Sequence, residues 1–218
     1  MPQLKMLFNA NKNALPELEI AEGFYLDTVK DSDLEQYNEL RKSVNFPEWT
    51  EEYLQTFRNK VLNDAMFVIK EKTTGKFCAA ATAETTDMKE YPEIGVLGWV
   101  MTHPDFRGHH LGKSVSVAAM HKLYKEGYRT FSLLTDDFRI AAVKTYLNLK
   151  WQPWLYLEDM EGRWHALAEK LEATILGDEA GTTDKPAGLF HNATALEIDY
   201  KNIVKQEQSL EEENITGN

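Results

Sequence analysis

The sequence predicts a mixed α/β (α+β) domain, with helices around a central sheet of six to seven strands, followed by a polar tail. Short segments rich in β-formers alternate with amphipathic helical segments over residues 24–171. Hydrophobic residues make up 43% and charged residues 27% of the 218 residues, as in globular proteins. Residues 177–187 are rich in Gly, Thr and Asp, and residues 205–218 are polar. We therefore place the domain at residues 1–176 and a linker with a flexible tail at residues 177–218.

The first half of the chain supplies a strand, two helices and two strands, in that order. Residues 24–29 alternate and predict a strand, and residues 31–33 offer N-caps for a helix over residues 34–44. Thr50 caps a second helix that we expect to reach Leu62. Two further strands are predicted at residues 65–72 and 77–85, with a hairpin turn between them.

The second half alternates strands and helices. An apolar strand at residues 96–102 is followed by a helix that ends at Glu126, before Gly127. The next elements are expected as follows: a strand at 129–135, a helix at 139–149, a strand at 151–157 and a helix at 160–171. Residues 193–200 could supply a seventh strand.

The rest of the chain is organised around residues 96–125, where a strand leads through a glycine loop into a helix. The first amides of a helix have no partner within it, and the helix dipole leaves partial positive charge there. Gly108 and Gly112 allow backbone N–H groups to approach an anion closely, and Arg107 and Lys113 stand beside them. This stretch predicts a binding site for a pyrophosphate group.

Residues 100–113 resemble the acetyl-CoA-binding motif of the GNAT N-acetyltransferases, whose pattern is Gln/Arg-x-x-Gly-x-Gly/Ala. Arg107 and Gly112 fit its first and last positions, whereas His110 stands where the first family glycine lies. A histidine adopts positive φ only at a cost. The motif survives this change because its binding atoms are backbone amides. The order of elements over residues 24–156 also agrees with the family.

The resemblance implies a GNAT fold whose sheet is splayed between the fourth and fifth predicted strands, with acetyl-CoA as cosubstrate. Free backbone groups at the end of the fourth strand would bind the pantetheine arm and the acetyl carbonyl. The implied cofactor-binding residues are Val100, Met101, Thr102, Arg107, Gly108, His109, His110, Leu111, Gly112, Lys113 and Arg139.

Tyr146 is the candidate catalytic acid. Residues 139–151 resemble the GNAT segment Asn-x-x-Ala-x-x-x-Tyr-x-x-x-Gly-Phe, with Arg139 in place of Asn and Lys150 in place of Gly. The family tyrosine protonates the departing thiolate, and a phenol with a pKa of about 10 keeps its proton at neutral pH. A core tyrosine on an amphipathic helix is the other interpretation.

Four carboxylates are candidates for the general base. Glu93, at the start of the central strand, is the one we carry forward, and Glu84, Asp136 and Asp137 are the alternatives. Each of them also suits a solvated surface position. No Cys/His spacing suits zinc, so we expect no metal.

The predicted activity is acetyl transfer from acetyl-CoA to a primary amine of a small molecule or peptide. The alternative is a non-catalytic CoA-sensing or interaction module on a GNAT scaffold, because His110, Arg139 and Lys150 depart from the family pattern. Two interpretations are open for a set of aromatic residues: they line an acceptor pocket, or they belong to the core. The residues are Phe46, Trp49, Trp151, Trp154 and Tyr156.

Charge and composition limit the partners and the compartment. The net charge of −11 argues against nucleic-acid binding. No apolar stretch approaches the ~18 residues of a membrane span, so we expect no membrane partner. The single cysteine, Cys78, suits a reducing, cytoplasmic setting. A homodimer is one assembly that we leave open.

Overall fold

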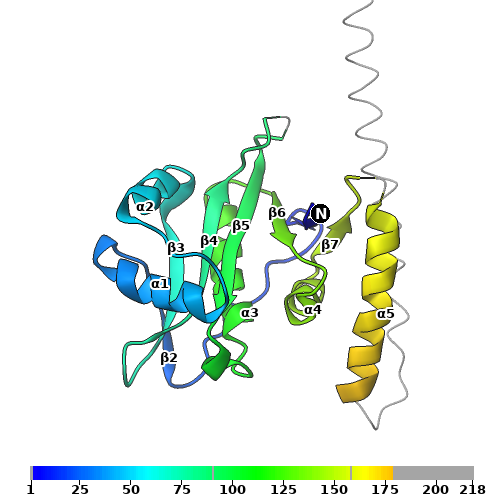
Figure 1. The fold of residues 1–218 in the computed structure, drawn as a ribbon. Coiled ribbons are helices and arrows are strands. Elements are labelled where there is room, and N and C mark those ends of the chain that lie inside the picture. Colours follow the sequence, from blue (N-terminus) through cyan, green and yellow to red (C-terminus); the bar gives the residue numbers. More distant parts are fainter. Residues whose placement is uncertain (1, 90, 158, 179–218) are drawn as a thin grey trace, which may run out of the picture. The chain divides into compact units, whose positions relative to one another are not determined.

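The structure, a computed structural model, describes residues 2–89, 91–157 and 159–178 (Figure 1). The expected mixed α/β fold is confirmed. Seven strands follow the order β2-β3-β4-β5-β6-β1-β7 in one sheet. The strands are β1 (Leu4–Asn9), β2 (Phe24–Thr28), β3 (Val61–Glu71), β4 (Phe77–Thr85), β5 (Ile94–Thr102), β6 (Thr130–Thr135) and β7 (Gln152–Trp154). The α-helices are α1 (Leu34–Ser43), α2 (Glu51–Arg58), α3 (Leu111–Lys125), α4 (Ile140–Asn148) and α5 (Met160–Asp178).

The chain divides into two compact units. The large unit comprises residues 7–134 and 148–150. The described part of the small unit comprises residues 2–6, 135–147, 151–157 and 159–178.

In the large unit, β2, β3, β4 and β5 pair antiparallel and β5 pairs parallel with β6. β4 is buried along almost its whole length, because α1 and α2 pack on one face of the sheet and α3 packs on the other (Figure 1). The core below α1 and α2 is rich in aromatic residues, among them Tyr37, Trp49 and Phe57.

Two expectations about the elements are corrected. The second helix ends at Arg58, not Leu62, and Val61 already begins β3. Thr85 donates its amide to the carbonyl of Lys60 at 2.8 Å, so pairing with the end of β4 replaces the helix at this point. The strand β1 was not predicted, because a short, almost wholly buried apolar run has no periodicity. It makes the seventh strand, whereas residues 193–200 lie outside the described residues.

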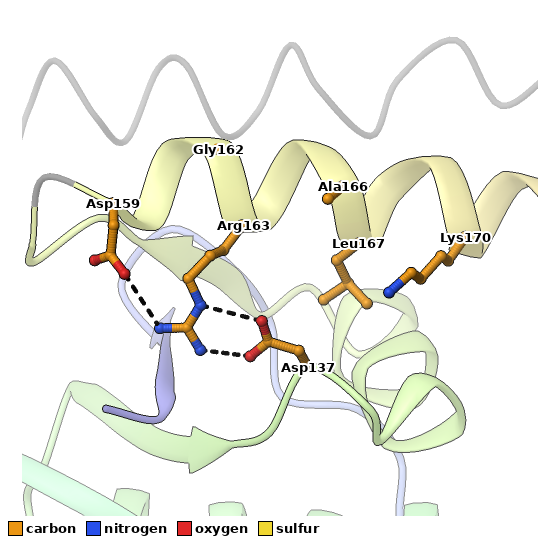
Figure 2. A pocket seen from close by; sticks show the side chains of 7 residues that line it. All are labelled: Asp137, Asp159, Gly162, Arg163, Ala166, Leu167 and Lys170. Carbon is orange, nitrogen blue, oxygen red and sulfur yellow. Dashed lines mark hydrogen bonds and ion pairs between the residues drawn. The ribbon is translucent and has the colours of Figure 1, made fainter. Parts of the chain in front are cut away.

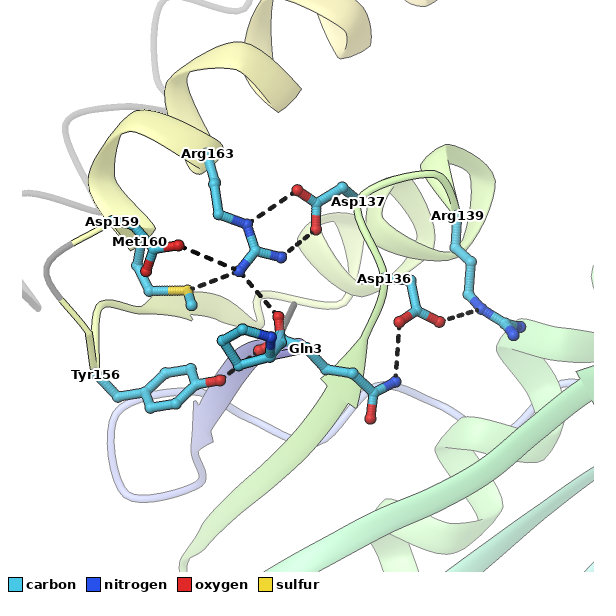
Figure 3. Close-up of polar contacts among 9 residues, drawn as sticks. Gln3, Asp136, Asp137, Arg139, Tyr156, Asp159, Met160 and Arg163 are labelled. Atoms are coloured by element: carbon cyan, nitrogen blue, oxygen red, sulfur yellow. Dashed lines mark hydrogen bonds and ion pairs between the residues drawn. The ribbon is translucent and has the colours of Figure 1, made fainter.

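In the small unit, Arg163 holds the start of α5 in place (Figure 3). Its guanidinium donates to both carboxylate oxygens of Asp137, at 3.0 and 2.5 Å, and to the carbonyl of Pro2 at 2.9 Å. A surface hollow of about 290 Å³ lies beside this pair, with Lys170 among its lining residues (Figure 2). Within the described parts of the chain, no helix has both the length and the apolar character of a membrane span.

Candidate functional site

The strands β5 and β6 part halfway along β5. They pair from Ile94 with Thr130 to Leu97 with Leu133, and no further. β5 continues to Thr102, and these last residues pair with β4 alone. Backbone groups on the β6 side of Gly98–Thr102 therefore lack a strand partner among the described residues. The expected splay between the fourth and fifth predicted strands is present.

A bulge in β5 lies at the same place. Between the pairs Ala80–Met101 and Thr82–Gly98, β5 has one residue more than β4. Trp99, inside this bulge, has a φ of 48°, which a bulky residue adopts only under strain. Strain of this kind is concentrated at functional sites. Because of the extra residue, the consecutive residues Gly98 and Trp99 both point to the face of the sheet that α1 and α2 cover.

The end of β5 leads into the α3 loop (residues 107–113), where the phosphate site was predicted. Residues 107–110 are exposed, and α3 begins only at Leu111. Gly108 and His110 have φ values of 86° and 56°. His110 thus adopts the backbone conformation that the family glycine permits. The first-turn amides of α3, which have no acceptor within the helix, lie behind an accessible loop.

The start of α3 packs tightly against the end of β5. A Cβ on Gly112 would lie 2.8 Å from the Oγ1 of Thr102, so this approach requires glycine. Lys113 pairs with the exposed Glu19 at 3.6 Å, which leaves its ammonium at the surface. The parted strand and the helix start are thereby joined within one unit. Together they fit an anion with an extended arm.

Met101 and His109 differ in the environment of their side chains. The side chain of Met101 is buried in the core below α1 and α2, so any contact that Met101 offers at the parted strand is through its backbone. Val100 and Thr102, its neighbours on β5, are partly exposed. The ring of His109 lies 5.3 Å from that of Phe24, at the outer side of the α3 loop.

Glu84 on β4 is the buried carboxylate nearest the parting. It accepts a hydrogen bond from Thr82, and a Cβ on Gly98 would collide with its side chain. Glu84 is 9% exposed, and burial raises the pKa of its carboxyl to about 7. It can therefore exchange a proton near neutral pH.

The position of Glu93 is different. It is exposed and directly precedes β5, at the end of the strand opposite to Thr102. A strand rises about 3.3 Å per residue, so the nine residues of β5 separate its two ends by roughly 26 Å. The structure does not bring Glu93 together with the α3 loop.

A second buried charge lies on the same face of the sheet. Arg41 of α1 is fully buried, and four rings surround its guanidinium. We call this group the Arg41 cluster; the distances from the guanidinium carbon are 4.1 Å to Trp49, 4.5 Å to Trp99, 5.6 Å to Phe46 and 6.0 Å to Tyr37. Phe46 and Trp49 were expected to line an acceptor pocket or to lie in the core, whereas neither Arg41 nor Trp99 was predicted at the site. Arg41 was detectable as a cation on the apolar stripe of the α1 segment.

The small unit holds the other predicted site residues. Tyr146 on α4 is 5% exposed, with its ring 6.3 Å from that of Trp151. Burial raises the pKa of its phenol, and the charge of Arg139 opposes this rise. The Nε of Arg139 donates to Asp136 at 2.9 Å (Figure 3). The roles of Tyr146 and Arg139 stay predictions.

The remaining candidate bases are engaged in polar contacts. Asp136 accepts from Arg139 and, at 3.1 Å, from Gln3. The Arg163 guanidinium holds the pKa of the Asp137 carboxyl below its usual range. A carboxylate with a lowered pKa is a poor proton acceptor at neutral pH, which argues against Asp137 as the general base.

Comparisons with known proteins agree with this geometry. The model of the acetyltransferase (GNAT) family matches residues 32–151, more than half of the chain. Its match spans the bulge, the α3 loop and Tyr146. No curated protein matches the sequence.

Solved structures share the fold at low identity. A GCN5-related N-acetyltransferase from Sphaerobacter thermophilus has a TM-score of 0.55 and 17% identity, over 71% of this chain and 50% of that one. A tandem GNAT protein from the clavulanic acid biosynthesis pathway has a TM-score of 0.54 and 15% identity, over 71% of this chain and 51% of that one. An N-acetyltransferase from Staphylococcus aureus Mu50 has a TM-score of 0.50 and 17% identity, over 58% of this chain and 82% of that one. This chain thus spans about half the length of the first two.

Proposed function

The chain belongs to the GNAT acetyltransferase family, and from that premise we propose that it transfers an acetyl group from acetyl-CoA to a primary amine, which attacks the thioester directly. The observation that carries this proposal is the parting of β5 from β6 beside the accessible start of α3. These two features would accommodate an acyl arm and a pyrophosphate within one unit.

The α3 loop would hold the pyrophosphate through backbone amides of residues 108–113, with Arg107 and Lys113 adding charge. The backbone groups of Val100, Met101 and Thr102 that face away from β4 would bind the arm. Bound acetyl-CoA supplies a thioester, whose carbonyl oxygen gains negative charge on attack. A β5 amide aimed at this oxygen would stabilise that charge.

Glu84 would accept the proton of the attacking amine, in place of Glu93. An alkyl ammonium has a pKa near 10 and must lose a proton before it can attack. With a pKa of about 7, Glu84 is partly ionised at neutral pH and can accept that proton directly or through a water. Its side chain borders Gly98, where β5 leaves β6.

Tyr146 would protonate the departing thiolate, as the family resemblance implies. Burial favours its neutral, proton-bearing form, which is the form that a general acid needs. Arg139 would contribute charge to the cofactor from its pair with Asp136.

Isothermal titration with acetyl-CoA and with CoA tests the cofactor site. We expect a dissociation constant between about 1 μM and 1 mM, the range of ordinary enzyme affinities for their substrates. Absence of binding at millimolar cofactor would end the proposal. Thiol release on addition of a panel of amines then separates an enzyme from a non-catalytic CoA-binding module, which would bind without release.

A further inference from the structure

The guanidinium of Arg41 is buried with most of its hydrogen-bonding capacity unused. Its Nε donates to the carbonyl of Pro47 at 2.7 Å. Its two terminal nitrogens, Nη1 and Nη2, are buried and make no hydrogen bond of normal geometry within the described residues. The hydroxyl of Tyr37 is near enough to interact with the guanidinium, but it too lacks a partner at hydrogen-bond geometry among these residues. These two nitrogens carry four N–H donors and a delocalised positive charge. Leaving such donors unpaired in a buried site is costly.

The four rings of the Arg41 cluster offset only part of this cost. Trp49 and Trp99 lie within 4.5 Å of the guanidinium carbon and attract the cation through their faces. A ring face is no substitute for the oxygen atoms that N–H groups prefer. The cluster therefore lacks an anion, and no carboxylate among the described residues pairs with Arg41.

The cluster is held rigid without that anion. The side-chain amide of Asn38 donates to the carbonyl of Trp49 and its oxygen accepts from the Trp49 amide, both at 2.8 Å. The amide of Phe46 donates to the carbonyl of Arg41 at 2.9 Å. Hydrogen bonds from α1 thus fix the loop between α1 and α2, and a rigid site binds a ligand with less entropic cost.

The cluster lies next to the proposed base. Trp99 directly follows Gly98, the residue that faces Glu84. Tyr37 is close enough to both Arg41 and Glu84 for both charges to act on its hydroxyl. Phe46 and Trp99 are partly exposed, so they mark the side from which a ligand would enter.

We propose that Arg41 binds a carboxylate of the acceptor, so that the acceptor is a primary amine that also bears a carboxylate, as an amino acid does. A planar guanidinium pairs with a planar carboxylate through two parallel hydrogen bonds. Flat aromatic walls suit that planar pair better than a tetrahedral phosphate. The carboxylate would anchor the acceptor while its amine faces Glu84; this orientation rests on the function proposed above.

Matched acceptors test the proposal with the full chain. Thiol release from acetyl-CoA is measured with amino acids, with their carboxamides and with the matching aminophosphonates. We expect the carboxylates to give a kcat/KM at least tenfold higher than the amides or the phosphonates. A preference for amides or phosphonates, or no preference, would overturn the proposal and leave amine acetylation intact.

Two variants assign the preference to Arg41. Arg41→Met keeps an unbranched stem among the rings and removes the charge, so kcat/KM for carboxylate acceptors should fall at least a hundredfold and that for amides less than threefold. Arg41→Lys keeps the charge but cannot form two parallel hydrogen bonds, so its kcat/KM for carboxylate acceptors should lie between those of the wild type and Arg41→Met. The matched control is Arg58→Met, on α2, whose guanidinium pairs with Asp31 at 2.8 Å; it should keep the preference. An equal loss for all acceptors in Arg41→Met would indicate a purely structural arginine.

A binding measurement separates this proposal from the one on which it rests. N-acetyl amino acids and their amides are titrated into the wild-type protein, with tryptophan fluorescence as the readout, because Trp49 and Trp99 touch the guanidinium. Carboxylate-selective binding without thiol release for any amine would retain the carboxylate site and refute acetyl transfer. Failure of the carboxylates to bind more tightly than the amides would refute the site, whether or not the variants fold.

Discussion

The α3 loop and the Arg41 cluster lie in the same unit and differ in what they present to a ligand. The α3 loop is exposed and offers backbone amides, and its shape depends on φ values at Gly108 and His110. The Arg41 cluster is buried and offers side chains: one guanidinium and four rings. The difference teaches that a backbone site tolerates a changed side chain, whereas a side-chain site does not. His110 illustrates this, because it keeps the left-handed conformation of a glycine.

The largest effect on activity is expected from Glu84→Gln, on the face of the sheet that α1 and α2 cover. Loss of the general base should lower kcat by about 10²- to 10⁴-fold. The affinity for acetyl-CoA, measured by titration calorimetry, should stay within threefold because the α3 loop is untouched. Glu93→Gln is the control and should leave kcat unchanged; the reverse pattern would return the role to Glu93.

The pH dependence should carry the signature of Glu84. Its pKa rises from 4.5 to about 7, so kcat/KM should increase as pH rises through about 7. Stability should move in the opposite direction. The protonated form is favoured in the folded state, so its contribution is fully present below pH 4.5 and is lost as pH rises through about 7. Glu84→Gln should flatten both profiles, and a wild-type rate that does not change between pH 6 and 8 would contradict the assignment.

Tyr146→Phe should lower kcat at least tenfold with the affinity for acetyl-CoA nearly kept. The phenol donates its proton only as the thiolate departs, so the cofactor ground state does not need it. Steady-state kinetics with a single good acceptor measures the effect. Unchanged turnover would leave Tyr146 as a core residue of α4.

Gly112→Ala should weaken acetyl-CoA binding by about tenfold, an effect of about 1.4 kcal/mol. The added Cβ would lie 2.8 Å from the Thr102 Oγ1 and push the start of α3 away from β5. The double variant Thr102→Ala/Gly112→Ala should recover most of the affinity, since the obstructing atom is gone. Gly162→Ala has open space around its Cβ and serves as the control for glycine replacement itself.

The smallest effect is expected from His110→Gly. Relief of the left-handed backbone gains about 1–2 kcal/mol, and the extra freedom of glycine in the unfolded chain costs about 0.5–1 kcal/mol. Stability to denaturant should therefore rise by about 1 kcal/mol or less. Affinity for acetyl-CoA should change less than threefold; a larger loss would show that the imidazole itself binds the cofactor, against the comparison drawn above.

The sequence predicted those features that depend on residues close together in the chain. The order of the elements from β2 to β7 and the cap at Thr50, whose Oγ1 accepts from the Tyr53 amide at 3.1 Å, follow from local periodicity and capping. The α3 loop was predicted for the same reason. β1 was missed because its environment is made by distant partners; the ring of Phe8, for example, stacks on Phe131 at 5.6 Å.

By itself the sequence determined the family and the kind of fold, and it predicted the loop that we propose for a pyrophosphate, because each depends on a short pattern of residue types. Only the tertiary structure showed that Glu84 is buried beside Gly98 and Glu93 exposed, and only it brought Arg41 together with Trp99. A carboxylate gains a raised pKa, and a guanidinium loses its partners, through burial by segments far apart in the chain. Burial of that kind is a property of packing and has no local signature in the sequence.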